Sequence, residues 1–201
     1  TIIILLIGLA RVYQAVHFPL DIIGGYCAGL LLLLLFIRFE APFGLWMHQK
    51  SLIIRIAFSL SASCAFILSS LVALASIGSW QLPPEWASVA FGQTGVSIDP
   101  LFPADTVVSA GLLFGSAAGA AISDEYARYE ANGSWSQKTA RYMIGIIILL
   151  AIWIPLGPAT TIPGIPGYLV LYIRPALAGL WITGGAPFLF QRAGLFNRTP
   201  G

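Results

Sequence analysis

Long apolar runs, separated by short polar or Pro- and Gly-rich segments, make up most of this chain. About twenty predominantly apolar residues in a helix are needed to cross the hydrocarbon core of a bilayer. Runs of this length recur along the chain, so we expect about five transmembrane helices. The predicted spans are residues 20–39, 51–78, 105–130, 138–156 and 168–190.

The first segment, residues 1–16, predicts a helix of a different kind. Its apolar part, residues 2–10, is too short to cross a bilayer. We therefore expect a truncated first helix, and we expect this chain to be the C-terminal part of a longer protein. The predicted fold class is all-α: a polytopic transmembrane helix bundle with about five full spans plus this truncated first helix.

Three segments connect the predicted spans. Residues 40–50 predict a polar turn, and residues 157–167 predict an uncharged loop rich in Pro, Gly and Thr. Residues 79–103 predict a long loop whose Trp residues suit the level of the lipid headgroups. A loop of this length is either functional, for example as a substrate gate, or loosely ordered, and the sequence leaves its role open.

Small residues mark the span predicted at residues 105–130. Gly111, Gly115 and Gly119 recur every four residues, so they share one face of the helix. A stripe of glycines lets a neighbouring helix approach closely in a membrane. We therefore expect this span to pack tightly against another one.

Composition excludes an ordinary soluble domain. Hydrophobic residues make up 58% of the chain, charged residues make up 9%, and the mean hydropathy is +0.86. Cys27 and Cys64 lie within apolar runs, where small core residues are more common than disulfides or metal ligands. The sequence shows no Walker loop, metal-ligand cluster or nucleic-acid-binding motif. We therefore expect an integral membrane protein with no cofactor, no metal and no nucleic-acid partner, and the sequence leaves its oligomeric state open.

One short segment, residues 10–21, concentrates polar chemistry at the edge of an apolar run. Arg11, His17 and Asp21 stand there together, although charge is expensive in a membrane. A neutral imidazole can attack phosphorus, a carboxylate can orient it, and the guanidinium fork matches phosphate oxygens. Pro19 suits the first position of a helix, so we expect His17 just before a helix N-terminus, where backbone N–H groups favour anions. The pattern predicts phosphoryl transfer.

At these residues the sequence resembles the type 2 phosphatidic acid phosphatase superfamily, which includes the vanadium haloperoxidases. The third motif of that family reads Ser-Arg-x5-His-x3-Asp and precedes a Gly-rich helix, and here Ala10 replaces the leading Ser. The resemblance implies that His17 is the catalytic nucleophile and forms a phosphohistidine, that Asp21 is its catalytic partner, and that Arg11 binds phosphate. The matching glycines of the following helix are Gly24, Gly25 and Gly29.

The two other motifs of the family, Lys-x6-Arg-Pro and Pro-Ser-Gly-His, do not occur in this sequence. The family takes further phosphate ligands and the general-acid histidine from them, whereas His48 has no adjacent acidic or histidine partner and is expected at the membrane interface. We interpret residues 1–39 as the C-terminal remnant of the phosphatase catalytic domain. Residues 40–201 resemble the C-terminal membrane helical extension of some bacterial and archaeal members.

Positive residues predict the orientation of the chain. The predicted loops 79–103 and 157–167 contain no Lys or Arg, so the positive-inside rule places them outside the cytoplasm. Because successive spans alternate sides, the segment with His17 is also expected on the outer face, in what we expect to be a prokaryotic cytoplasmic membrane. The basic residues expected in the cytoplasm are Arg38, Lys50, Arg55, Arg128, Lys138, Arg141, Arg192 and Arg198.

Two functions fit the sequence. The favoured one is an integral membrane lipid phosphatase that hydrolyses a lipid phosphomonoester or diphosphate, with this chain alone expected to be inactive. The alternative is a non-catalytic membrane bundle, either transporter-like or a scaffold formed by a degenerate family member. The lipid is open among undecaprenyl diphosphate, phosphatidate and phosphatidylglycerophosphate, and an outer site favours an exported carrier lipid.

The span predicted at residues 168–190 holds Arg174 one or two turns inside the membrane. An intramembrane arginine is by default a functional hypothesis. The alternative is a structural role, in which Arg174 bonds carbonyls freed by the adjacent Pro175, and we favour that alternative. Its role is left open.

Overall fold

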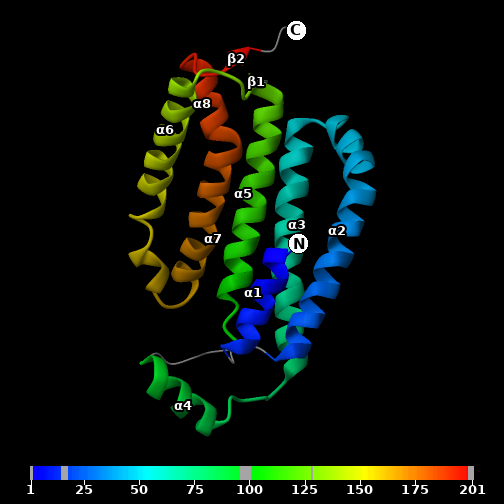
Figure 1. The fold of residues 1–201 in the computed structure, drawn as a ribbon, viewed down its shortest axis with the longest axis vertical. Helices are drawn as coiled ribbons and strands as arrows, with labels where there is room; N and C mark the ends of the chain where they lie inside the picture. The colour runs from blue at the N-terminus through cyan, green and yellow to red at the C-terminus, as the bar shows by residue number, and fades with distance from the viewer. Residues whose placement is uncertain (1, 15–17, 96–100, 128, 199–201) are drawn as a thin grey trace. The chain divides into compact units, whose positions relative to one another are not determined.

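The computed structural model describes residues 2–14, 18–95, 101–127 and 129–198. Within these residues the fold is helical, apart from one antiparallel pair of two-residue strands. In chain order the elements are α1 (Ile2–Tyr13), α2 (Pro19–His48), α3 (Leu52–Ile77), α4 (Pro84–Thr94), α5 (Ala104–Tyr126), β1 (Tyr129–Glu130), α6 (Trp135–Trp153), the 3-10 turn η1 (Pro158–Thr161), α7 (Ile165–Leu180), the π-helical turn η2 (Trp181–Gly185), α8 (Ala186–Arg192) and β2 (Asn197–Arg198) (Figure 1).

The predicted spans are confirmed. Among the described residues, five helical segments are long and apolar enough to cross a membrane, while α1, with 12 residues, is shorter. The chain divides into two compact units, Thr1–Lys50 and Ser51–Gly201. The spanning segments are Pro19–His48, Leu52–Ile77, Ala104–Tyr126, Trp135–Thr161 and Ile165–Arg192.

Two predicted connections are wrong. The expected polar turn at residues 40–50 is mostly helix, because α2 continues through Pro42 as far as His48. A proline removes only one hydrogen bond of the ladder, and the apolar residues after it continue the helix. The expected loop at residues 79–103 contains α4, which begins at Pro84 with Glu85 in its first turn and ends at Gly95 in the left-handed conformation. Each of these residues favours a helix end at its position.

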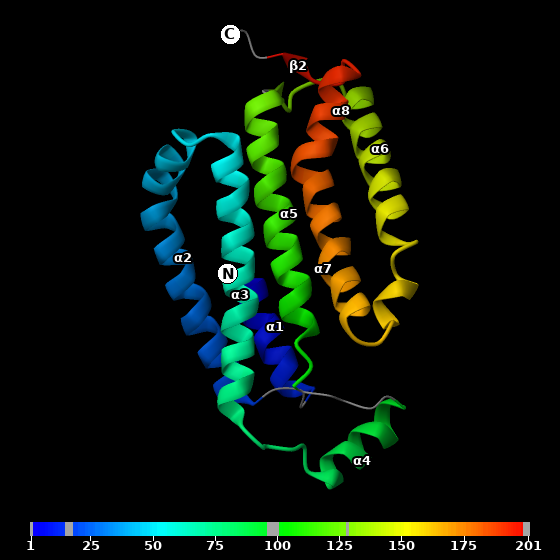
Figure 2. The ribbon, with the colours of Figure 1, turned by 180° about the vertical axis from the view of Figure 1, so that it is seen from behind.

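In the Ser51–Gly201 unit, α5 is the central helix and packs against α3 and α7. Figures 1 and 2, which view the fold from opposite sides, both place it between these two helices. A Cβ atom added to Gly111 or Gly115 would collide with the backbone carbonyl of Tyr172 or Ala176 on α7. The prediction from the glycine stripe is therefore confirmed, because backbone stands directly against backbone along this contact.

Serine and tyrosine hydroxyls join the three central helices. The Ser63 side chain is fully buried, and its Oγ donates to the carbonyl oxygen of Ala110 at 2.7 Å. The same Oγ lies 2.9 Å from the Tyr172 hydroxyl. A buried hydroxyl must find a partner because desolvation without one is costly. These bonds therefore connect α3 to both α5 and α7.

The last span changes its helical geometry part of the way along. The π-helical turn Trp181–Gly185 lies between α7 and α8. The ring of Pro187 would clash with the carbonyl of Thr183 in a continuous α-helix, and the wider turn avoids this clash. Thr183 Oγ1 lies 2.8 Å from the Ser116 carbonyl oxygen of α5. The wider turn therefore still packs on the central helix.

The C-terminal segment returns to the turn between α5 and α6. Tyr129 of β1 pairs with Arg198 of β2 in an antiparallel register. At this end of the unit, an Arg55 Nη atom lies 2.9 Å from an Asp124 carboxylate oxygen and joins α3 to α5. Arg141 is also buried there, and it donates to the Ala131 carbonyl oxygen at 3.0 Å. Arg55, Arg141 and Arg198 therefore lie at the same end of the Ser51–Gly201 unit.

Candidate functional site

The first two helices of the chain pack through one glycine. Gly8 is the buried residue of α1, and a Cβ atom there would collide with the Tyr26 hydroxyl and the Ile22 side chain of α2. The Tyr26 hydroxyl donates to the Ile4 carbonyl oxygen at 2.7 Å. These contacts hold the last turn of α1, which carries Arg11, beside the first turns of α2. Sequence reasoning did not single out Gly8 or Tyr26, although an isolated glycine in an apolar helix is itself a signal of close packing.

The N-terminus of α2 forms as the sequence predicts. Phe18 is the N-cap in an extended conformation, and Pro19 is the first helical residue. Asp21 is the third helical residue, and its Oδ2 accepts a hydrogen bond from the Phe18 backbone N–H at 3.0 Å. This is the acidic half of a capping box, and the carboxylate also favours the positive end of the helix dipole. Asp21 is therefore held in place by the backbone of its own helix.

Arg11 and Asp21 line the same cavity within the Thr1–Lys50 unit. Its volume is about 260 Å³, and both charged side chains are exposed. A guanidinium fork and a carboxylate thus share one compartment that is otherwise apolar, apart from the Tyr26 hydroxyl. The third predicted site residue, His17, lies outside the described residues. The remaining lining residues are Ile4, Ile7, Gly8, Ile22, Gly25 and Tyr26.

In the part of the chain that the structure describes, no group of three or more His, Cys, Asp or Glu residues is placed to hold a metal ion. Cys27 and Cys64 are both exposed free thiols. The described residues of this cavity present a guanidinium beside a carboxylate that the start of α2 anchors.

Two family models match the chain. The model of the PAP2 superfamily matches residues 1–45, and the model described as PAP2 superfamily phosphatase, transmembrane extension, matches residues 107–198. The chain belongs to the PAP2 superfamily. This is the type 2 phosphatidic acid phosphatase superfamily that the Arg11, His17 and Asp21 motif predicted, and membership supports a membrane phosphatase. No curated protein and no solved structure matches the chain.

The two PAP2 matches correspond to different parts of the fold. The superfamily model covers α1 and most of α2, including Arg11 and Asp21, whereas the extension model covers most of α5 and continues to β2. Residues 46–106, which include α3 and α4, lie in neither match. The boundary predicted at residue 40 between a catalytic remnant and an extension stays a prediction.

Arg174 lies in the PAP2 extension and contacts α6. Its Nε donates to the Trp153 carbonyl oxygen at 2.9 Å, and its guanidinium carbon lies 3.9 Å from the centroid of the Trp153 ring. Trp153 is the last residue of α6, where carbonyl groups lack partners in the helix. A cation at this end also complements the helix dipole. The structure thus gives Arg174 a capping contact with α6. The sequence favoured a different structural role, in which Arg174 bonds the carbonyl groups freed by Pro175.

Proposed function

We propose that this chain carries part of the active site of an integral membrane lipid phosphatase, which hydrolyses a lipid phosphomonoester or diphosphate. The observation that carries the proposal is the shared cavity of Arg11 and Asp21 at the N-terminus of α2. A helix N-terminus and an arginine both favour a phosphate group there. Membership of the PAP2 superfamily supports the same chemistry.

In the proposed mechanism, the His17 imidazole attacks phosphorus in line. A nitrogen–phosphorus bond forms as the bond from phosphorus to the lipid oxygen breaks, and the general acid of the second family motif protonates the departing oxygen. Water then attacks the phosphohistidine, which releases inorganic phosphate and restores the imidazole. Arg11 stabilises the negative charge on the phosphoryl oxygens during both steps.

Asp21 has two roles in this proposal. One carboxylate oxygen holds the start of α2 through the Phe18 N–H. A carboxylate has several acceptor positions, so the same group can also accept a hydrogen bond from the His17 ring and fix its tautomer. Asp21 would therefore position the nucleophile relative to the helix N-terminus that binds phosphate.

Phosphate release from lipids tests the proposed activity. We expect the purified full-length protein that carries this sequence to release inorganic phosphate from undecaprenyl diphosphate, phosphatidate or phosphatidylglycerophosphate in detergent micelles. Release should persist in the presence of a chelator, because a histidine nucleophile needs no metal-activated water. The 201-residue chain alone should be inactive, since its sequence lacks two of the three motifs. A full-length protein that hydrolyses none of these lipids would favour the non-catalytic alternative.

We also propose that the phosphatase site faces outward. Arg55 lies in the first turn of α3 and Arg141 in the second turn of α6, and Figures 1 and 2 show the starts of these two helices at one end of the Ser51–Gly201 unit and α4 at the other. The positive-inside rule places the basic end in the cytoplasm. Alternation of the spans along the chain then places the N-terminus of α2 on the outer side, where an exported carrier lipid such as undecaprenyl diphosphate would present its phosphate.

Labelling of single cysteines tests this orientation. In a background with Cys27 and Cys64 replaced, a cysteine at Ser88 should react with an impermeant thiol reagent in intact spheroplasts, because α4 is expected outside. A cysteine at Ser136 should react only after the membrane is permeabilised. Both serines are exposed, and Ser136 avoids Ser134, whose side chain caps α6. The reverse labelling pattern would overturn the orientation and the preference for a carrier lipid.

A further inference from the structure

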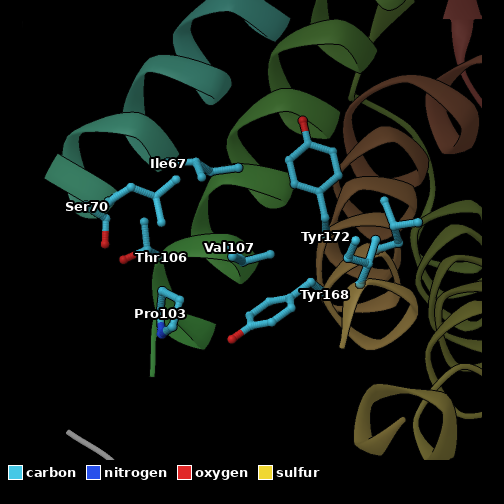
Figure 3. Close-up of a pocket in the computed structure, with 10 residues that line it drawn as sticks. Ile67, Ser70, Pro103, Thr106, Val107, Tyr168 and Tyr172 are labelled. Carbon is cyan, nitrogen blue, oxygen red and sulfur yellow. The ribbon is translucent and has the colours of Figure 1, made fainter. Parts of the chain in front are cut away.

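A cavity of about 460 Å³ lies between α3, α5 and α7 in the Ser51–Gly201 unit. Val107 of α5 forms its floor and is only 8% exposed. Ile67 and Leu71 line it from α3, and Tyr168 and Tyr172 line it from α7 (Figure 3). The cavity is therefore walled by three membrane-spanning segments.

The packing of the central helices explains why this space exists. Gly111 and Gly115 bring α7 into backbone contact with α5, and α3 packs on another part of the same helix. Tyr172 lines this space, and its hydroxyl lies 2.9 Å from Ser63 Oγ of α3. On the open side, Leu71 and Leu169 are 49% and 54% exposed. The cavity therefore opens between α3 and α7 onto the apolar surface of this unit.

The lining selects an apolar occupant. Its ten residues include no charged side chain, and six of them are apolar. Four residues carry hydroxyls, of which that of Tyr172 is hydrogen-bonded to Ser63, and those of Ser70, Thr106 and Tyr168 belong to one end of the cavity. A buried water needs two to four polar partners, and an anion needs donors or positive charge. The volume lies in the range of sites that hold small ligands, about 300 to 1,000 Å³. A hydrocarbon chain satisfies these conditions, and the bilayer supplies such chains directly at the opening.

We propose that this cavity holds one acyl chain of a bilayer phospholipid. The hydroxyl-bearing residues Ser70, Thr106 and Tyr168 lie where α3 approaches its end and α5 and α7 begin. That end of the three helices faces the headgroup region, so the chain enters there and runs toward Tyr172. All its residues belong to the Ser51–Gly201 unit, and none of them lines the cavity that Arg11 and Asp21 share.

Photo-crosslinking tests the proposal. The full-length protein is reconstituted into phosphatidylcholine vesicles that contain a phospholipid with a diazirine on one acyl chain, and the crosslinked residues are mapped by mass spectrometry after illumination. Crosslinks should concentrate on residues 103–107 and 165–172 relative to Ile147 of α6 and Ile154, the residue that follows α6, which are also exposed. Labelling spread evenly over the exposed apolar residues of all spans would overturn the proposal.

A matched pair of variants sharpens the test. Val107→Trp fills the floor of the cavity and should lower crosslinking to residues 165–172 several-fold. Leu113→Trp makes a bulky substitution on the same helix, at a residue that is 45% exposed and outside the cavity lining, and should leave that yield unchanged. An unchanged yield in a folded Val107→Trp protein would overturn the assignment. If that variant does not fold, the crosslinking map of the wild-type protein tests the proposal by itself. Neither readout depends on phosphatase activity.

Discussion

Replacing His17 with Ala should lower the phosphatase kcat of the full-length protein by about a thousandfold or more, because the proposed nucleophile is removed. Phosphate release from the preferred lipid is the measurement, together with acid-labile, base-stable phosphate on the trapped protein as a signature of phosphohistidine. Both signals should be lost together. Full activity in purified His17→Ala protein would refute the assignment of the nucleophile.

Two variants of Asp21 distinguish its proposed role in orienting His17 from its role in capping α2. Asp21→Asn should retain a reduced rate, because the amide oxygen still accepts from the Phe18 N–H while the negative charge that stabilises an imidazolium is gone. Asp21→Ala should lose the cap as well and lower the activity further. Circular dichroism that is unchanged in His17→Ala and Asp21→Asn serves as the folding control. Equal activity of Asp21→Asn and wild type would remove Asp21 from the mechanism.

Gly115→Ala should destabilise the fold by about 3 kcal/mol, near the upper end of the usual cost of overpacking. The added methyl group would collide with the backbone of Ala176, and a backbone atom of a packed helix cannot move aside as a side chain can. Relaxation would require α7 to move away from α5. This movement would strain the hydrogen bond between Ser63 and Tyr172 and the bond from Thr183 to the Ser116 carbonyl oxygen. Thermal unfolding in detergent, followed by tryptophan fluorescence, measures the effect.

Gly145→Ala is the matched control for this change. It makes the same chemical substitution in another spanning helix, α6, but its Cβ atom would meet only the Phe190 ring at an ordinary distance of 3.6 Å. Alanine favours helix over glycine by about 1 kcal/mol, so this variant should unfold at the same temperature or slightly higher. If both variants unfold at the same temperature as wild type, the backbone contact between α5 and α7 does not contribute to stability as we propose.

The sequence by itself determined the membrane class, the spans and the family. Span length and apolarity are properties of continuous segments, since a helix satisfies its own backbone hydrogen bonds in lipid. The Arg11, His17 and Asp21 motif is equally local, and so is the start of α2 at Pro19. The glycine spacing of α5 also predicted a close contact, because residues four apart share one face of a helix.

Helix ends inside connecting segments were predicted less well. The helix signals of α4 at Pro84, Glu85 and Gly95 were present in the sequence, but a segment rich in proline favours loop when it is judged by composition. The continuation of α2 beyond Pro42 was missed for a related reason, because one proline does not end a helix whose flanking residues keep the hydrogen-bond ladder.

Only the tertiary structure decided which segments meet. The α7 partner of the glycine stripe, the capping of α6 by Arg174, and the pairing of β1 with β2 join residues far apart in the chain. The cavity on Val107 has the same origin, because residues of α3, α5 and α7 line it together. Periodicity shows which face of a helix is small or apolar, but it does not identify the neighbour, since lipid and protein side chains are equally apolar in a membrane.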